Sequence, residues 1–178
     1  MCCMPIALTP SGGKQIWNLM EPMDFSVSLP CPAKVNLTLA VTGRRADGFH
    51  ELGSLVARIR FGDWLELQWE PEGCPKDDRV RFDGLALDPV NNTVLAAIRS
   101  WRRASGFAAG AFRVRVRKSI PVGAGLGGGS SNAASTLMAI RKLDLKGAGP
   151  VDWTELAAEV GSDVPLFLGD PVLLMEGR

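Results

Sequence analysis

The chain has 178 residues, enough for one domain with a substantial core, and a formal net charge of +1. This near-neutral balance gives no sign of a protein that binds nucleic acid or a membrane surface. No apolar run approaches the roughly 18 residues that a transmembrane helix needs. We therefore expect neither nucleic acid nor a membrane among the partners.

Cysteine usage and the first residues indicate a cytoplasmic protein. The four cysteines show no C-x-x-C spacing, which argues against a zinc site, and the adjacent Cys2-Cys3 pair suits a disulfide framework poorly. Residues 1–24 lack the charged-then-apolar order of a signal peptide. We interpret them as an unstructured extension or an early start, with Met20 and Met23 as rival initiation sites, and residues 25–178 as the domain.

Strands are predicted to fill most of the first half of the domain. Alternating apolar residues between turn formers predict them at residues 25–30, 33–42, 52–60, 64–69 and 79–82. Pro30-Cys-Pro32 parts the first two, and Gly62-Asp63 is predicted to join the next two in a hairpin. Two later strands are predicted at residues 112–118 and 171–175.

Helices dominate the second half. Asn91-Asn-Thr93 offers an N-cap to a helix over residues 94–104 that Gly106 closes, and an apolar run predicts another over residues 133–140. Asp152-Trp-Thr-Glu155 has the spacing of a capping box and opens a helix that runs to Val160. The order of strands first and helices later, without internal repeats, indicates the α+β class, with a mostly antiparallel sheet and helices on one face.

The run PVGAGLGGGSSNA, from Pro121 to Ala133, has the clearest functional meaning. Glycines let a backbone approach a ligand closely, and the helix behind them directs unpaired N–H groups and a partial positive charge at the loop. That combination is typical of a phosphate cradle. The alternative is a flexible linker, but linkers do not normally run straight into an amphipathic helix.

Two widespread phosphate loops do not fit this run. A Walker A loop needs a lysine after its last glycine, and Gly128 is followed by Gly129 and Ser130. A dinucleotide fingerprint matches Gly123, Gly125 and Gly128. However, the strand before the loop alternates strictly, whereas strands of dinucleotide-binding sheets are buried on both faces and read as continuous apolar runs.

The pattern Pro-x-x-x-Gly-Leu-Gly-Gly-x-Ser-Ser-x-Ala resembles the phosphate loop of the GHMP kinase superfamily, small-molecule kinases that hold ATP without a Walker lysine. Its longer form, Gly125 to Ala133, is similar to that of the branch that phosphorylates 4-diphosphocytidyl-2-C-methyl-D-erythritol in the non-mevalonate isoprenoid pathway. The resemblance covers Cys31 to about Gly177. It implies a GHMP-kinase N-terminal ATP-binding domain with ATP and Mg²⁺ as cofactors.

The resemblance also implies which residues bind ATP. They are the members of the loop, namely Pro121, Val122, Gly123, Ala124, Gly125, Leu126, Gly127, Gly128, Gly129, Ser130 and Ser131. Family members continue into a second, substrate-closing domain that this chain lacks, so we interpret the chain as a fragment or a truncated product. A non-catalytic nucleotide-binding remnant is the corresponding alternative to an enzyme.

Two other segments resemble the family's catalytic motifs. Pro32-Ala-Lys-Val-Asn36 is similar to its first motif, which implies an active-site role for Lys34 and, on the same strand face, substrate binding by Asn36. Gly161-Ser-Asp-Val-Pro165 is similar to the segment with the catalytic base, which implies that Asp163 takes the hydroxyl proton. Without the resemblance, Lys34 is a solvent-facing strand lysine and Asp163 an N-cap.

Arg45-Ala-Asp-Gly-Phe-His50 resembles the family's cytidine-recognition segment, which implies that Phe49 stacks on cytosine and His50 hydrogen-bonds its edge. Tyrosine is usual at position 49, so stacking is kept and any role of the hydroxyl is lost. This segment favours a cytidylyl substrate over homoserine or mevalonate, the substrates of rival GHMP kinases. The oligomeric state has no signature in the sequence.

Two groups of side chains have competing interpretations. Ser130 and Ser131 are candidates to cap the helix, to contact phosphate or to ligate Mg²⁺ through hard oxygen atoms. Arg113, Arg115 and Arg117 are interpreted as a solvated strand face, with a phosphate-binding stripe as the alternative.

Overall fold

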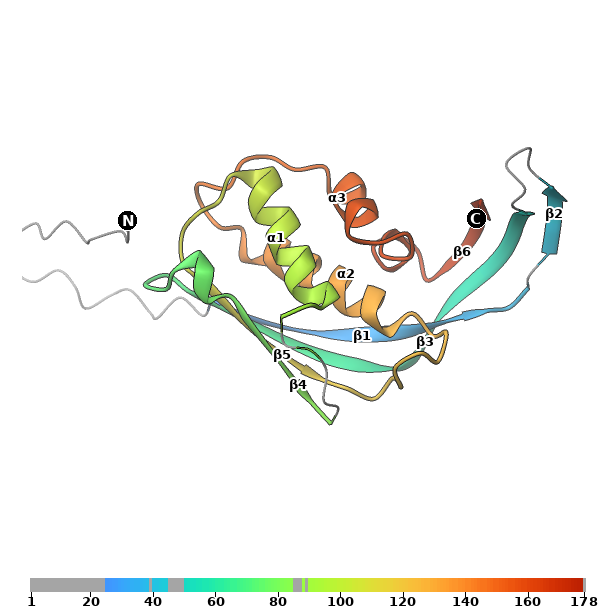
Figure 1. Cartoon of the computed structure of the whole chain (residues 1–178), viewed down its shortest axis with the longest axis horizontal. Coiled ribbons are helices and arrows are strands. Elements are labelled where there is room, and N and C mark those ends of the chain that lie inside the picture. Colours follow the sequence, from blue (N-terminus) through green and yellow to red (C-terminus); the bar gives the residue numbers. More distant parts are fainter. Residues whose placement is uncertain (1–24, 39, 45–49, 85–87, 89, 178) are drawn as a thin grey trace, which may run out of the picture.

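The computed structural model describes residues 25–38, 40–44, 50–84, 88 and 90–177. Within these ranges, three α-helices lie on one face of a six-stranded sheet, and the other face is left open (Figure 1). The predicted α+β class is therefore confirmed. None of the helices in the described ranges is both long and apolar enough to cross a membrane.

One long strand organises the sheet. The strands are β1 (Ser26–Asn36), β2 (Ala40–Arg44), β3 (His50–Glu70), β4 (Arg79–Asp83), β5 (Ala111–Arg117) and β6 (Val172–Gly177). β3 pairs antiparallel with β1, β2, β5 and β6, and the main path of the sheet is β1-β3-β5-β4. β4 and β5 pair in parallel, so the sheet is mostly antiparallel, as predicted.

The helices are α1 (Thr93–Ser105), α2 (Gly128–Leu143) and α3 (Trp153–Val160), with short 3₁₀ turns η1 (Pro75–Asp77) and η2 (Pro165–Phe167). Two of these three helices, α1 and α3, begin and end within one residue of their predicted bounds. Asn92 caps α1 by accepting the N–H of Leu95, and Asp152 caps α3 by accepting two backbone N–H groups. Both predicted N-caps are confirmed.

The alternation in β5 separates the two faces of the sheet. Val114 and Val116 are buried against the helices, in a core that also holds Phe112 and Leu65. Arginines on the opposite face form ion pairs with acids of the neighbouring strands: Arg117 with Glu66 at 2.8 Å, Arg113 with Glu70 at 3.0 Å, and Arg115 with Asp83. This pairing supports the interpretation of the arginines as a solvated strand face.

Two predicted breaks in the strands are wrong. β1 runs through Pro30 and Pro32 because it lies at the end of the main path, where a missing N–H breaks no ladder on its outer side. β3 runs through Gly62 and Asp63 instead of turning there. A Cβ at Gly62 would collide with the carbonyl oxygen of Cys31, so this glycine serves close strand packing at a register shift.

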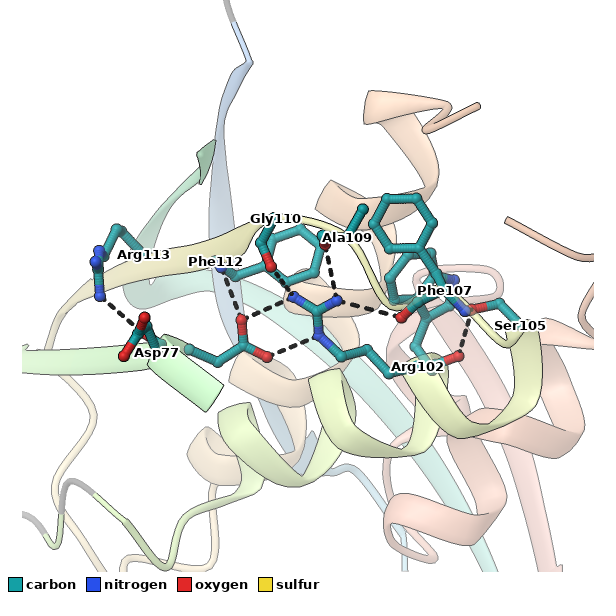
Figure 2. A network of polar contacts seen from close by, with 10 residues as sticks. Asp77, Arg102, Ser105, Phe107, Ala109, Gly110, Phe112 and Arg113 are labelled. Carbon is teal, nitrogen blue, oxygen red and sulfur yellow. Dashed lines mark hydrogen bonds and ion pairs between the residues drawn. The ribbon is translucent and has the colours of Figure 1, made fainter. Parts of the chain in front are cut away.

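A buried ion pair fixes the connection between α1 and β5. Arg102 Nε lies 2.8 Å from Asp78 Oδ2, and both side chains are about one-tenth exposed. The guanidinium also donates to the carbonyls of Phe107, Ala109 and Gly110, which surround it in Figure 2. Asp78 Oδ1 in turn accepts the N–H of Phe112 at 2.8 Å. One carboxylate and one guanidinium therefore satisfy three carbonyls of this connection and one N–H of β5.

Replacing Arg102 by methionine is expected to lower the free energy of unfolding by about 3–5 kcal/mol, because the buried Asp78 carboxylate loses its partner. Urea denaturation measures the loss. Arg103→Met is the matched control, since it removes an exposed pair with Glu159 and is expected to cost less than about 1 kcal/mol. Equal losses in the two variants would contradict the assigned role of Arg102.

Candidate functional site

The glycine loop is attached to β1 through its backbone. The N–H of Lys34 donates to the carbonyl of Leu126 at 2.9 Å. Gly127 has φ 70°, and a Cβ there would lie 2.9 Å from Lys34 Cγ and 3.0 Å from Phe167 Cζ. Both the positive φ and the close approach require glycine. β1, the loop and η2 therefore meet at Gly127.

Helix α2 begins inside the glycine run, five residues before its predicted start at Ala133. Gly127 is its N-cap, without a side-chain hydrogen bond, so the interpretation of Ser130 and Ser131 as caps is wrong. Ser131 is fully buried, and its hydroxyl has no hydrogen-bond partner within the described part of the chain. Half-buried Ser130 is thus the more accessible of the two serines to a ligand.

A pocket of about 370 Å³ opens beside the loop. Its walls come from the loop, from the N-terminal end of α1 and from the strands below, and its lining residues are Phe82, Asp88, Asn91, Asn92, Thr93, Lys118, Asn132 and residues 121–129. The hydroxyl of Thr93 donates to the carbonyl of Gly129 at 2.8 Å and joins the two helix ends. Two helix N-termini face one pocket, which favours an anion.

Lys118 is a candidate residue that the sequence analysis missed. Its side chain is only 4% exposed, it lines the pocket, and its ammonium would lie 3.3 Å from a Cβ at Gly128. The loop therefore has a neighbouring cation although it lacks a Walker lysine. The alternation of side chains along the strand could have revealed this residue. Arg115 and Arg117 face outward, so Lys118 points to the buried helix side, where a lysine is unusual.

Three predicted residues from two distant segments come together at the end of β1. Lys34 Nζ lies 3.1 Å from Asn36 Oδ1 and 4.0 Å from Asp163 Oδ2. The Lys34 side chain is 11% exposed and that of Asp163 is 36% exposed, so the carboxylate is open to a ligand while the lysine is largely shielded. The interpretation of Lys34 as a solvent-facing lysine is therefore wrong.

The segment that carries Asp163 is anchored from both sides. Val164 and Phe167 are buried in the core, and the guanidinium of Arg58 donates to the carbonyl of Phe167 at 2.8 Å. The N-cap position of η2 is occupied by Val164 without a side-chain bond, so Asp163 does not serve as the N-cap of this turn. Its carboxylate remains available for chemistry.

Gly127 connects the pocket with the Lys34–Asp163 pair. It lines the pocket on one side and packs against Lys34 on the other. Phe49 and the side chain of His50 lie outside the described part of the chain, so their predicted contacts remain predictions. Gly127 thus separates an anion pocket on one side from Lys34, with its partner Asp163, on the other.

Two larger pockets, of about 540 and 770 Å³, lie on the open face of the sheet. Neither is lined by any of the predicted site residues. We assign the site to the smaller pocket because helix N-termini and backbone amides surround it. Within the described ranges, no group of three or more His, Cys, Asp or Glu side chains is arranged to hold a metal ion.

Cys31 lies near this region but is chemically inert. Burial raises the pKa of its thiol to about 12, so the thiol stays protonated at neutral pH. It packs in the core beside Leu65 and is fully buried. Burial and the raised pKa of its thiol both argue against a nucleophilic role for this cysteine.

The sequence matches known kinases over most of its length. Residues 92–169 match the family model of the GHMP kinases N terminal domain. The chain is 40% identical over 143 residues to the 4-diphosphocytidyl-2-C-methyl-D-erythritol kinase of Methylococcus capsulatus, covering 80% of this chain and 48% of that protein. It is 41% identical over 147 residues to the kinase of the same name from Pelotomaculum thermopropionicum, covering 82% and 50% respectively.

Solved structures match the fold. The crystal structure of a 4-(cytidine 5'-diphospho)-2C-methyl-D-erythritol kinase aligns with a TM-score of 0.71 at 37% identity, over 85% of this chain and 52% of that one. A homoserine kinase from Cytophaga hutchinsonii aligns with a TM-score of 0.54 at 22% identity, over 83% and 44%, and supports the fold alone. The chain therefore has the fold of a GHMP kinase N-terminal domain and spans about half the length of the curated relatives it matches.

Proposed function

We propose that this chain is the ATP-binding half of a cytoplasmic kinase that phosphorylates the 2-hydroxyl of 4-diphosphocytidyl-2-C-methyl-D-erythritol, a step in isoprenoid precursor biosynthesis. The observation that carries the proposal is the meeting of three segments at Gly127. The anion pocket and Lys34 lie on adjacent sides of this residue, and Asp163 Oδ2 lies 4.0 Å from the Lys34 ammonium. Phosphoryl transfer needs such a phosphate cradle beside a base and a cation.

The pocket fits a nucleoside triphosphate. Backbone N–H groups of the glycine loop and the first turn of α2 are suited to phosphate oxygens, and Lys118 adds a positive charge. The end of the pocket at Asp88, Asn91 and Asn92 offers polar side chains for a nucleoside. Glycines at 123 and 125 have open space where a Cβ would be, so the backbone itself is free to contact a ligand.

Mg²⁺ is proposed to arrive with the triphosphate. Magnesium commonly binds through substrate phosphates and only one or two protein oxygens. This fits a pocket that lacks a cluster of carboxylates among the described residues. The hydroxyl of Ser130, in the first turn of α2, is the proposed protein ligand, and the buried Ser131 is not.

Asp163 and Lys34 are proposed to act on the acceptor hydroxyl. Bound ATP supplies the γ-phosphoryl group. The exposed carboxylate of Asp163 would accept the hydroxyl proton, and the Lys34 ammonium would stabilise the oxygen as its charge develops. Asn36 orients Lys34 through its amide oxygen. Burial of the lysine strengthens this electrostatic effect because less water screens it.

The cytidylyl substrate is proposed from the segment at Phe49 and His50 and from the names of the relatives. An aromatic ring for stacking and an imidazole for a base edge suit cytosine. The rival within the family is a kinase for homoserine or mevalonate. Outside the enzymes, the rival is a non-catalytic nucleotide-binding remnant.

Asp163→Asn is expected to abolish phosphoryl transfer, because the amide cannot accept the proton, while ATP affinity stays within about twofold of the wild type. ADP formation with ATP, Mg²⁺ and the cytidylyl substrate measures turnover, and calorimetry measures affinity. Full turnover in the variant would refute the role of Asp163 as the base. ATP binding without turnover in the wild-type chain would favour the remnant.

Gly127→Ala is expected to weaken ATP binding at least about tenfold more than Gly123→Ala, as measured by calorimetry. Both positions have positive φ and carry similar backbone strain, but only the Cβ at 127 meets Lys34 and Phe167. Gly123→Ala therefore serves as the matched control for strain. Equal effects would contradict the assignment of Gly127 as the contact point.

CMP is expected to bind this chain, and Phe49→Ala to weaken CMP binding about tenfold through lost stacking while ATP affinity is retained. Competition calorimetry with CMP and ATP measures both affinities. Homoserine and mevalonate serve as comparison ligands. Binding of mevalonate or homoserine without binding of CMP would replace the cytidylyl assignment by that rival.

A further inference from the structure

Asp63 is a buried acid with no part in the mechanism proposed above. Its side chain is fully buried in β3, beside the register shift. Its Oδ1 accepts the N–H groups of Ser119 and Ile120 at 2.7 and 2.8 Å, and its Oδ2 accepts from the ammonium of Lys118. One carboxylate therefore holds three consecutive residues, the ones between β5 and the glycine loop.

Lys118 lines the nucleotide pocket, and Ile120 lies directly under the helix that begins there. Ile120 is 1% exposed, and a Cβ at Gly128 would lie 2.9 Å from Ile120 Cγ2. The first turn of α2 thus rests directly on a residue whose backbone Asp63 fixes. A shift of Ile120 would move the helix N-terminus that faces the pocket.

The Lys118 ammonium has N–H groups that are not used by Asp63. An ammonium carries three N–H groups, and within the described part of the chain Asp63 is the one side chain to which the Lys118 ammonium donates a hydrogen bond. The same side chain lines the nucleotide pocket. A buried ion pair is weak evidence for stability, because desolvation offsets the attraction between its charges. A pair retained at the edge of an anion pocket therefore suggests a role in binding.

We propose that Asp63 is a positioning residue for the nucleotide. Its carboxylate orients Lys118 so that the remaining N–H groups of the ammonium face the phosphates, and it fixes the entrance to the glycine loop. Asp63 itself does not touch the ligand. This inference rests on the proposed nucleotide-binding function and assigns a partner to the cation of that site.

The test is a double-mutant cycle with Asp63→Asn and Lys118→Met, read out as calorimetric affinities for ATP and for adenosine. Asparagine keeps an oxygen for the two backbone N–H groups and removes the negative charge. Each single variant is expected to weaken ATP binding about tenfold or more, because a charge-assisted hydrogen bond to phosphate is lost or misplaced. Adenosine affinity, which involves no phosphate, is expected to stay within about twofold.

In the Lys118→Met background, Asp63→Asn is expected to change ATP affinity by less than about twofold, since its effect acts through Lys118. An equal loss in both backgrounds, or equal losses for ATP and adenosine, would overturn the proposal and leave Asp63 a purely structural residue. If the Asp63→Asn single variant does not fold, the double variant still tests the proposal, because removing both charges of a buried pair is usually tolerated. It then has to match Lys118→Met in ATP affinity.

The same titrations distinguish a failure of the proposed nucleotide binding from a failure of the role of Asp63. A wild-type chain that binds ATP no more tightly than adenosine would contradict the phosphate pocket, and with it the role of Asp63. A wild-type chain that prefers ATP, with an Asp63 effect independent of Lys118, would overturn only the positioning role.

Discussion

The close approach of Lys34 to Gly127 is the constraint on which the candidate site depends. A residue with a side chain at position 127 would push against both Lys34 and Phe167. Because this position is glycine, the end of β1, the start of α2 and the η2 turn share one point of contact. Three segments far apart in the sequence thereby place an anion pocket next to a shielded lysine and its partly exposed carboxylate partner.

The one-sided sheet makes this arrangement possible. All three helices lie on the same face (Figure 1). The N-termini of α1 and α2 therefore converge on one pocket, while the open face carries paired arginines. Buried charges are concentrated where the backbone changes direction. Arg102 satisfies the carbonyls after α1, and Asp63 satisfies the amides before the glycine loop. Each replaces regular backbone pairing at a connection.

Local signals predicted much of the fold, and long-range contacts explain most of the errors. Asn92 and Asp152 lie next to the groups they cap, so their roles were visible in the sequence. Gly62 and Asp63 have the composition of a turn, but their environment is set by Cys31 and by Ser119, which lie far away in the chain. α2 begins five residues before its predicted start because its first glycines and serines, which are weak helix formers, are held in the helix by tertiary packing. At the site, the family resemblance predicted Lys34 and Asp163. Lys118 could have been predicted only from the alternation of side chains along its strand.

We propose that the glycine loop and the Lys34–Asp163 pair form one nucleotide-dependent site. Titration of the ¹⁵N-labelled chain with ATP and Mg²⁺, followed by two-dimensional NMR, tests it most directly. The largest amide shifts are expected in the loop, residues 123–129, with smaller ones at Lys34 and Asp163. Shifts confined to the open face of the sheet, or no shifts at saturating ATP, would contradict the claim.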